Sequence, residues 1–540
     1  MKILPFLIAS VLAAASTVVS PTLDEEVAPE PVRVALAVPI TVPPQNSGML
    51  PAETLEQYTA LDGLLTRRLD DVINRPVALG IDPMIVASIR VLGSAAPASA
   101  VTWLSRVEQA ENDTFLLGYA DSDTVALLRA GAAAPLMPTS FDLDPAHFVR
   151  DDGSGKTTLE LPSADSLLSW PRSVGSFVWP ASGSMNADDM AAANGLGAVT
   201  ALLSASAVTG ETGHVSIEGA SAVVSNDAVS RFITSNAVSA PGTDMSESVE
   251  SLAESLGDAA AASADRPLFA TFDRDPYSSS TGIPSTIDAM VSHPRFELVP
   301  LRDVLSSEAV PATLGPDGSS PDAVTTLSTL LGAEAELVPF SSVLNDPSLL
   351  LGERRRSLLA LASYSWQADT AAWEKEIASW MTRSATIPTL VKLSDSSTLN
   401  FYQDKGNLPI PVSNELPWPV TVTVNVHSTT GILVITDGEV KVELEPRSQK
   451  RASIPVESIA NGRVDLEVSL HSTSGVPISG TQILTTNVVA GWETTATLVG
   501  AGIVLVIFIA GIVRTIVLRR KRGSSASPVS SEHDPHSASE

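Results

Sequence analysis

Short apolar runs of strand length alternate with longer amphipathic or alanine-rich stretches through the first three hundred residues. Hydrophobicity is continuous within most of the short runs, which is typical of strands buried on both faces of a sheet. We expect strands at 32–38, 76–81, 114–119, 176–179, 198–203, 214–217, 222–224, 267–272 and 297–300. We expect helices between them, at 51–72, 83–92, 100–110, 122–130, 187–194 and 245–262. This alternation predicts a (β/α) barrel-like domain with a parallel sheet over residues 30–310.

From residue 320 to residue 390 the strand pattern disappears and helical periodicity dominates, which predicts a helical connector packed against the barrel. Trp366, Trp373 and Trp380 recur in this segment at a spacing of seven residues. A row of tryptophans can form a platform for a carbohydrate, but aromatic side chains at helical spacing more often pack into a core. We therefore favour packing of these rings between the connector and the barrel.

Three consecutive arginines, Arg354–Arg356, follow Glu353 within the connector. A run of charge on a helix is usually a solvated surface, so we interpret these side chains as an exposed and partly ion-paired face. Docking of the run against the acidic barrel is the alternative.

Beyond residue 389 the pattern changes to a period of two. Val420, Val422, Val424 and Val426 alternate with polar residues, and similar alternation recurs at 440–445, 464–470 and, less regularly, 481–489. Each such strand has one polar and one apolar face, and Gly, Pro and Asn turns separate the strands. The pattern predicts an antiparallel immunoglobulin-like β-sandwich over residues 395–490.

The run Thr495–Leu518 is apolar except for Arg514, and it is followed at once by Arg519, Arg520, Lys521 and Arg522. This arrangement predicts a transmembrane helix at 495–518 with a cytoplasmic tail at 519–540. An alanine-rich apolar stretch after Lys2 predicts a signal peptide at 1–20, with a second membrane anchor as the alternative. We therefore expect a type I single-pass protein of the cell membrane whose bulk is extracytoplasmic.

The charge of the chain limits its partners. The net charge is −28, and such a surface repels phosphate backbones, so we expect no binding of nucleic acid. Neutral glycans, cations and basic proteins remain as partners. The chain contains no cysteine, which excludes disulfides and means that its stability comes from burial in a large fold. An exported chain without disulfides favours a bacterial envelope protein over an animal cell-surface receptor.

Several short motifs occur in a characteristic order along the chain. They are GIDP at Gly80–Pro83, YADSD at Tyr119–Asp123, FVWPASG at Phe177–Gly183, FDRD at Phe272–Asp275, SYSW at Ser363–Trp366 and GNLPIPVSNELPWPVTV at Gly406–Val422. The chain in this respect resembles the DUF6049 family, an actinobacterial family of membrane-anchored proteins. The resemblance implies an envelope protein with a glycosidase-like or deacetylase-like N-terminal region and a C-terminal β-sandwich. It also implies a cell-wall context, because members tend to be encoded near the lipid II flippase, but it supplies no catalytic residues.

Acidic residues follow several of the expected strands, where the active sites of such barrels lie. Asp82 follows the expected strand at 76–81, Asp121 the one at 114–119 and Asp273 the one at 267–272. Two carboxylates facing each other across a sugar can act as acid and base or as acid and nucleophile, and we expect Asp82 to pair with Asp121 or Asp273. The alternative is structural, because an aspartate before a proline, as in Asp82–Pro83, begins a helix without any catalytic role. In the same way Asp275 precedes Pro276 and can begin a helix, and Asp121, Ser122 or Asp123 can cap the helix that follows them. Arg274 stands between Asp273 and Asp275, and Asn226 and Asp227 follow the expected strand at 222–224.

Other chemistries are disfavoured. No two of the histidines before the span have the spacing of a local zinc motif; they are His147, His214, His293, His427 and His471. A metal-dependent deacetylase is therefore not expected, and neither is a bound metal or cofactor. The chain contains no GxSxG elbow, and the GSGKT run at Gly153–Thr157 lacks the preceding strand of a phosphate-binding loop, so we interpret it as a polar loop.

These patterns lead to one expected function and two alternatives. We expect a glycan-binding or cell-wall-assembly accessory protein, non-enzymatic or vestigially enzymatic, in which a β-sandwich holds a barrel above the membrane. The first alternative is a glycoside hydrolase that uses Asp82 with Asp121 or Asp273. The second, a receptor that signals through its tail, has little support because the tail is short.

Overall fold

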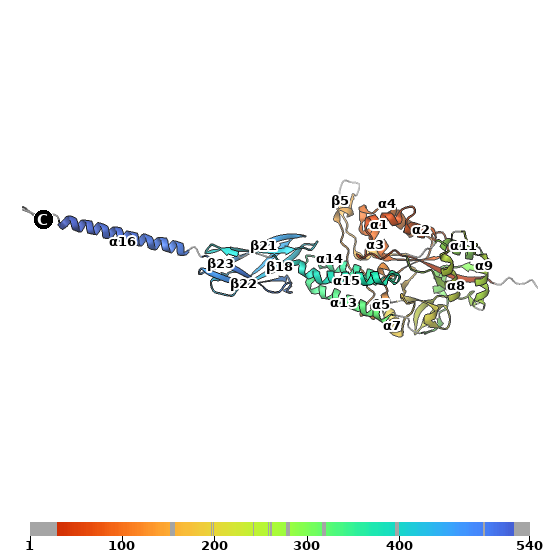
Figure 1. The fold of residues 1–540 in the computed structure, drawn as a ribbon. Helices are drawn as coiled ribbons and strands as arrows, with labels where there is room; N and C mark the ends of the chain where they lie inside the picture. Colours follow the sequence, from red (N-terminus) through yellow and green to blue (C-terminus); the bar gives the residue numbers. More distant parts are fainter. Residues whose placement is uncertain are drawn as a thin grey trace, which may run out of the picture.

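The computed structural model describes residues 30–151, 157–195, 197, 199–240, 242–257, 259, 262–276, 281–315, 320–394, 399–489 and 492–522. The expected signal peptide at 1–20 and the last part of the expected tail, 523–540, lie outside the described residues. Most of the GSGKT run also lies outside them. Figure 1 shows an elongated molecule in which a mixed α/β part, a helical connector, β-sandwich-like sheets and one long helix follow one another.

Five strands form a parallel sheet in the N-terminal part: β1 (Val32–Ile40), β2 (Ala78–Ile81), β3 (Thr114–Leu116), β11 (Leu268–Thr271) and β12 (Phe296–Leu298). The strand β1 is central, since β11 and β2 flank it and β12 pairs with its first residues. Its large side chains, such as Val34 and Leu36, pack into the core formed with the helices, whereas Ala35 and Ala37 belong to a second core on the other face. Burial on both faces explains why the run is apolar throughout.

A second sheet has the order β13–β9–β10–β7–β6. Its strands are β6 (Ser176–Val178), β7 (Val199–Leu203), β9 (Gly213–Ile217), β10 (Ala220–Val224) and β13 (Val310–Pro311). Its pairs are parallel except for β9 and β10, which form an antiparallel hairpin. Two-stranded ladders join β4 (Val149–Asp151) to β5 (Thr157–Leu159) and β8 (Val208–Thr209) to β14 (Thr313–Leu314).

The two sheets of this part are joined by hydrogen bonds at two places. Next to β3 the Val174 amide donates to the Thr114 carbonyl (2.8 Å), and just after β10 the Asn226 amide donates to the Phe269 carbonyl of β11 (2.7 Å). The sheets share one apolar core, which consists of Ala35, Ala37, Ala78, Phe115, Leu117, Leu202, Val223, Phe269, Val299, Leu301 and Val304. The strand pairing thus gives a mixed α/β fold with two sheets, and the single barrel sheet expected from the sequence is not confirmed.

The helices of this part are α1 (Ala52–Thr59), α2 (Leu64–Asp70), α3 (Pro83–Val91), α4 (Ala98–Gln109), α5 (Thr124–Arg129), α6 (Ala164–Leu168), α7 (Ala187–Gly195), α8 (Asp227–Ala237), α9 (Ser246–Leu256), α11 (Ile283–Ser292) and α12 (Leu301–Ser306). The single helix expected at 51–72 is wrong, because a turn before Gly63 divides it into α1 and α2. A Cβ at Gly63 would lie 2.3 Å from the Tyr58 carbonyl oxygen, so this close turn requires glycine.

The connector is helical, as predicted. It consists of α13 (Pro321–Ser341), α14 (Pro347–Leu361), the 3-10 turn η5 (Tyr364–Ala368) and α15 (Thr370–Thr386). Proline stands at the first position of both α13 and α14, where its fixed φ favours a helix start.

The arginine run of α14 is not the solvated face that we expected. Arg354 and Arg356 are 1% and 7% exposed, whereas Arg355 pairs with Glu334 at 2.7 Å. The Arg354 guanidinium lies 3.9 Å from the centre of the Trp380 ring and donates to the Trp380 carbonyl oxygen (3.1 Å). A flat guanidinium can be buried when a ring and oxygen acceptors replace its water, and this packing overrides the surface preference of arginine.

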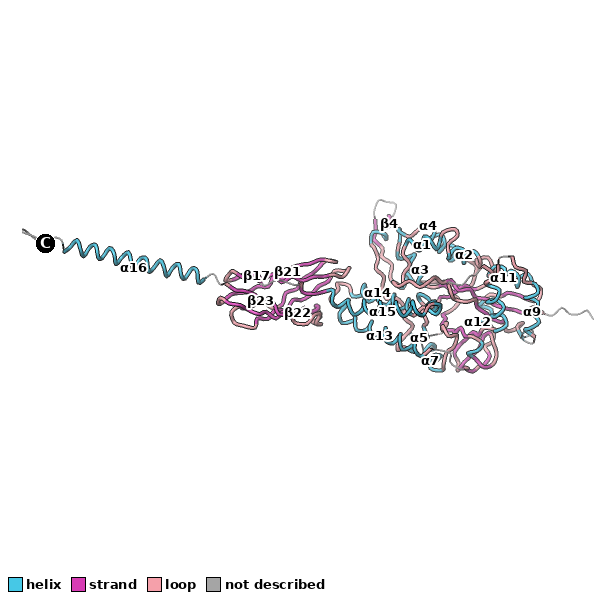
Figure 2. Tube along the Cα trace, viewed as in Figure 1, coloured by secondary structure: helices cyan, strands magenta, loops and turns pink. Residues whose placement is uncertain are grey.

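Two facing sheets form the part next to the long helix, and their strands are those of a β-sandwich (Figure 2). One sheet contains β15 (Val391–Leu393), β17 (Lys405–Asn414), β19 (Leu433–Ile435) and β21 (Ser448–Ser458). The other contains β16 (Leu399–Phe401), β18 (Val420–Ser428), β20 (Glu439–Leu444), β22 (Gly462–Ser472) and β23 (Gln482–Val488). The period-two prediction is confirmed in β18, where Val420, Val422 and Val424 are fully buried between the sheets.

The connector contributes side chains to the sandwich core. Phe340, Val343 and Leu344, around the end of α13, belong to the same buried cluster as Val420 and Val422. The backbone joins there as well, since the Thr421 amide donates to the Val343 carbonyl (2.8 Å). The sandwich is therefore packed onto the connector rather than tethered to it.

The chain continues from the sandwich into α16 (Trp492–Arg522). Within it, the span 497–520 contains an 18-residue window with a mean hydropathy of 2.6, and the side chains of that window are not buried in the protein. In the described part of the chain, one helix is long enough and apolar enough to cross a membrane, and it is α16.

Candidate functional site

Asp82 lies just beyond β2 and is 1% exposed. Its Oδ1 accepts hydrogen bonds from the amides of Met84 and Ala120, both at 2.8 Å. The first bond confirms that Asp82 is the N-cap of α3, and the second joins β2 to the segment after β3. Burial raises the pKa of Asp82 to about 8, a rise that the Met84 amide opposes and the nearby charge of Asp121 increases.

Asp121 ends the 3-10 turn η2 (Tyr119–Asp121), in which Ala120 and Asp121 both have positive φ angles of 58° and 50°. Its Oδ1 lies 3.2 Å from Arg274 Nη1, and both side chains are 3% exposed. Burial raises the pKa of Asp121 to about 6 although the positive charge of Arg274 lowers it. Within the described part of the chain, Asp121 Oδ2 and Arg274 Nη2 are buried without a hydrogen-bond partner.

Arg274 follows β11 and is held by two aromatic rings. Its guanidinium carbon lies 4.5 Å from the centre of the Trp179 ring and 4.4 Å from that of Tyr364, while Nη1 donates to the Trp179 carbonyl (3.0 Å). Tyr364 comes from η5 of the connector, so the connector covers the ends of these strands. The ring of Tyr364 covers Arg274 and so shields its ion pair with Asp121 from solvent.

Asp273 stands apart from this buried pair. It is exposed, and its Oδ1 accepts from the Tyr364 hydroxyl (3.2 Å) and from the Asp275 amide (3.1 Å). The structure therefore brings Asp82 close to Asp121, whereas Asp273 is exposed and contacts the hydroxyl end of Tyr364. Residues 277–280 lie outside the described residues, so the expected helix start at Asp275 and Pro276 stays a prediction; the next described helix, α11, begins at Ile283 with Gly282 as its N-cap.

A cavity of about 430 Å³ opens beside this cluster, between the strand ends and the connector. Its walls come from α5 and the loop after β6 on one side and from α13, η5 and α15 on the other. The polar lining includes Asp123, Ser182, Asp322 and Gln367, and the aromatic lining is Tyr364, Trp366 and Trp373.

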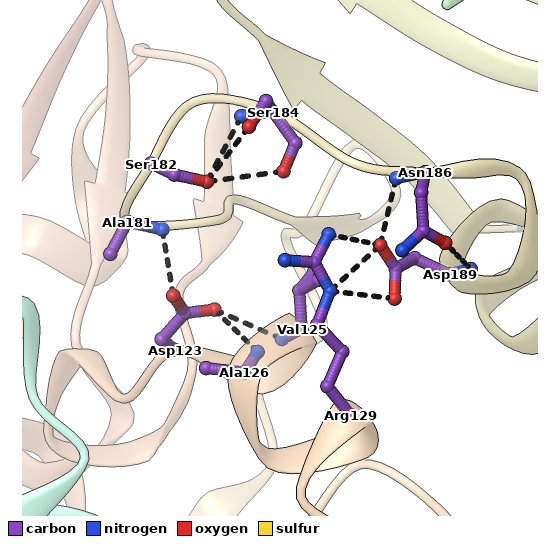
Figure 3. Close-up of polar contacts among 9 residues, drawn as sticks. All are labelled: Asp123, Val125, Ala126, Arg129, Ala181, Ser182, Ser184, Asn186 and Asp189. Carbon is purple, nitrogen blue, oxygen red and sulfur yellow. Dashed lines mark hydrogen bonds and ion pairs between the residues drawn. The ribbon is translucent and has the colours of Figure 1, made fainter. Parts of the chain in front are cut away.

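Hydrogen bonds fix the wall formed by α5 and the loop after β6 (Figure 3). Asp123 caps α5 by accepting from the Val125 and Ala126 amides, both at 3.0 Å, and its other oxygen accepts from the Ala181 amide (3.0 Å). Arg129 makes a two-oxygen ion pair with the buried Asp189 at the start of α7. The wall is therefore formed before any ligand binds.

The aromatic wall is equally constrained. The indole nitrogens of Trp366 and Trp373 donate to the carbonyls of Ala360 (2.8 Å) and Leu361 (2.7 Å). Both rings are half-buried at the cavity, whereas Trp380 is fully buried and donates to Ser357 Oγ (2.8 Å). The prediction that the tryptophan row packs into a core is confirmed for Trp380, and Trp366 packs against the same core while its ring also lines the cavity. Trp373 lines the cavity.

Five of the sequence motifs meet at this place. GIDP contains Asp82, YADSD contains Asp121 and Asp123, FVWPASG contains Trp179 and Ser182, FDRD contains Asp273 and Arg274, and SYSW contains Tyr364 and Trp366. Sequence reasoning missed the roles of Tyr364, Trp179 and Arg129. The shared aromatic character of FVWPASG and SYSW was the one available signal.

The described residues contain no group of three or more His, Asp or Glu side chains placed to hold a metal ion. Two of the histidines have ordinary partners there: His214 contacts the Ser307 carbonyl (2.8 Å) and His293 lies 3.0 Å from Glu250.

A family model described as "Family of unknown function (DUF6049)" matches residues 9–535. No curated protein is significantly similar to the chain.

Three solved structures illustrate the structural matches. WR4, a C. elegans member of the MSP family, is 11% identical over 18% of this chain and 97% of its own, with a TM-score of 0.15. Trypsin-activated alpha-2-macroglobulin from Escherichia coli is 16% identical over 18% of this chain and 7% of its own, also at 0.15. The E. coli chaperone DraB is 16% identical over 19% of this chain and 56% of its own, again at 0.15. Matches with these TM-scores carry no inference about fold or function.

Proposed function

The chain belongs to the DUF6049 family, and from this premise we propose that it is a membrane-anchored binding protein of the cell envelope that holds a cell-wall glycan in the cavity beside Tyr364. The observation that carries the proposal is the pre-formed cavity with its two fixed tryptophans and its polar rim. Glycan binding here needs no chemical step by the protein.

The anchor in this proposal is α16. Four basic residues, Arg519–Arg522, follow the apolar stretch, and basic residues next to a span stay on the cytoplasmic side. This orientation makes the rest of the described chain extracytoplasmic, where a wall glycan would be within reach.

We place the cavity at the open end of a barrel-like enclosure. This assignment is supported by the two sheets that meet at Thr114 and at Asn226 and by the apolar core that they share. In such an arrangement the carboxyl ends of the strands converge, and ligand sites of (β/α) barrels lie at that end.

The chemistry of the cavity suits a neutral saccharide. Aromatic rings such as Trp366 and Trp373 offer flat apolar surface, while Asp123, Ser182 and Gln367 offer hydrogen-bonding groups beside it. Because hydrogen bonds hold both indoles in place, little conformational entropy is lost on binding. The net charge of −28 disfavours a polyanionic ligand.

The alternative is a glycoside hydrolase that uses Asp82 with Asp121 or Asp273. One observation favours it: burial raises the pKa of Asp82 to about 8, and a general acid must be protonated near neutral pH. The arrangement around the acids favours binding instead, because Asp82 and Asp121 are 1% and 3% exposed and Asp121 is paired with Arg274, which the ring of Tyr364 covers. Hydrolysis would require side chains to move before a sugar could reach either acid.

The test uses the full chain in lipid nanodiscs and chitotetraose, a neutral oligomer of N-acetylglucosamine, followed by isothermal titration calorimetry. We expect the wild type to bind, and Trp373→Ala and Trp366→Ala each to weaken binding about tenfold, which corresponds to about 1.4 kcal/mol for one lost aromatic surface. The matched control is Trp418→Ala, which removes a half-buried indole from the distant sandwich and should leave the affinity unchanged.

Two measurements on the same samples can contradict the proposal, calorimetry and mass spectrometry. Absence of binding by the wild type, or equal weakening in Trp418→Ala, contradicts a glycan site in this cavity. Mass spectrometry of the sugar provides the second readout, because cleavage by the wild type that disappears in Asp82→Asn would replace the binding function by the hydrolase.

A further inference from the structure

One end of the sandwich exposes three apolar side chains: Tyr402 is 67% exposed, Ile459 is 57% exposed and Val489 is 46% exposed. They come from different segments that hydrogen bonds hold together. The Val489 amide donates to the Phe401 carbonyl (2.8 Å), and the Ser458 amide donates to the Asp404 carbonyl (2.8 Å). We call Tyr402, Ile459 and Val489 the apolar tip. Exposed apolar side chains gathered in this way mark a surface that contacts something else.

The apolar tip is the end at which the chain leaves the sandwich for α16. The last strand, β23, ends at Val488, and α16 begins at Trp492 and extends away from the sandwich (Figure 1). The apolar stretch of α16 begins at Thr497, about 8 Å along the helix from Trp492 at ~1.5 Å per residue. The headgroup layer on each side of a bilayer is about 5–8 Å thick, so Trp492 lies at the level of that layer when α16 spans the membrane. Val489 of the tip is three residues earlier, which is at most about 11 Å of chain from Trp492.

The side chains of the tip suit this layer better than bulk water. Tyrosine concentrates at membrane interfaces, and Tyr402 is the most exposed side chain of the tip. Charge does not drive the contact, because Asp404 adjoins Tyr402 and Lys405 is paired with Glu457 (3.0 Å). A zwitterionic lipid surface therefore suffices.

We propose that the apolar tip is a lipid-contact surface that rests in the headgroup layer of the membrane crossed by α16. The contact limits tilting of the sandwich relative to the bilayer. This inference rests on the anchoring role of α16 in the proposed function, but it does not depend on the cavity or its ligand.

The absence of native cysteine makes the test direct, because single cysteines can be labelled at chosen sites of the full chain. Ile459→Cys and Tyr402→Cys carry a bimane fluorophore in phosphatidylcholine nanodiscs that contain lipid with a nitroxide on its headgroup. The matched control is Ile483→Cys, an isoleucine on the same sandwich that is as exposed as Tyr402 (68% against 67%). It lies five residues before Val488 on β23, or about 17 Å farther from the membrane.

We expect the nitroxide to quench the fluorophores at 459 and 402 at least about threefold more than the fluorophore at 483, because quenching requires closeness to the headgroups. A fourth variant, Leu505→Cys, with a nitroxide on the lipid acyl chain reports the position of α16. Quenching at 505 with none at 459 and 402 would overturn the lipid contact while leaving the anchor intact. No quenching at 505 would overturn the anchor and the contact together.

Discussion

At the scale of single residues, Asp82 shows how one buried carboxyl group links stability to pH. Its Oδ1 joins the start of α3 to the turn after β3, and burial raises its pKa to about 8. An aspartate in the unfolded chain has a pKa of about 3.9. The folded state therefore holds an additional proton between these two values, and the free energy of unfolding falls as the pH rises through this interval.

Replacing Asp82 by asparagine should reduce this pH dependence. The amide keeps an oxygen for the two backbone donors but has no proton to lose, so the variant should lose less stability than the wild type between pH 6 and pH 8. Chemical denaturation of the full chain in detergent micelles, followed by circular dichroism, measures the difference. Below pH 6 a slope should remain in the variant, because burial also raises the pKa of Asp121 to about 6. Parallel slopes in both proteins across the whole range would contradict the buried, protonated Asp82.

The sequence predicted part of this cluster and missed the rest for a physical reason. Asp82 and Asp123 were recognisable as N-caps because a cap depends on neighbours two or three residues away. The contact between Arg274 and Tyr364 joins residues ninety positions apart, and no local pattern specifies it. The same holds for Arg354, whose burial depends on the ring of Trp380 in another helix.

At the scale of elements, the cavity depends on how α5 begins. Asp123 satisfies two orphan amides of the first turn and in addition holds the loop after β6 through the Ala181 amide. One side chain thus fixes both the helix start and the wall opposite the tryptophans.

Asp123→Ala should therefore cost more than the loss of an ordinary cap. We expect a decrease of about 1–2 kcal/mol in the free energy of unfolding, at the upper end of the range for N-caps. Asp144→Ala is the control, since Asp144 is exposed and accepts from one amide, that of Ala146 (2.9 Å). Urea titration of the two variants and the wild type gives the comparison. Equal costs for Asp123→Ala and Asp144→Ala would show that the bond to Ala181 contributes nothing.

Element types were predictable where burial has a clear period. The continuous run of β1, the helical connector and the alternation of β18 all match their predictions, because one or two buried faces impose the pattern. The antiparallel direction of β9 relative to β10 and the division of the expected helix into α1 and α2 were not predicted. Each depends on a tight turn, and Gly63 gives no sign in the sequence that its site lies against a carbonyl oxygen.

At the scale of the whole molecule, the connector and the sandwich form one unit because they share a core. Leu344 packs among the sandwich residues and pairs with Val420, whereas Leu330, earlier in the same connector, packs in the core of the α/β part. The same substitution, leucine to alanine, at positions 344 and 330 can therefore distinguish an effect on the sandwich core from an effect on the core of the α/β part.

Leu344→Ala should speed amide hydrogen exchange in β17 and β18, although the substitution lies outside the sandwich. A buried leucine lost in this way typically costs about 2–5 kcal/mol of stability, and the sandwich should bear part of that cost. Leu330→Ala should leave exchange in these strands unchanged. Hydrogen exchange with mass spectrometry on the full chain reads both variants, and unchanged exchange in Leu344→Ala would mean that the two parts are mechanically independent.

The shared core at Leu344 has a consequence for the function that we propose. Because the sandwich is packed onto the connector, the cavity stays at a nearly constant distance from the sandwich end that faces α16. A cavity that binds wall glycan would then reach only the strands that lie at that distance from the membrane, whatever their chemical fit.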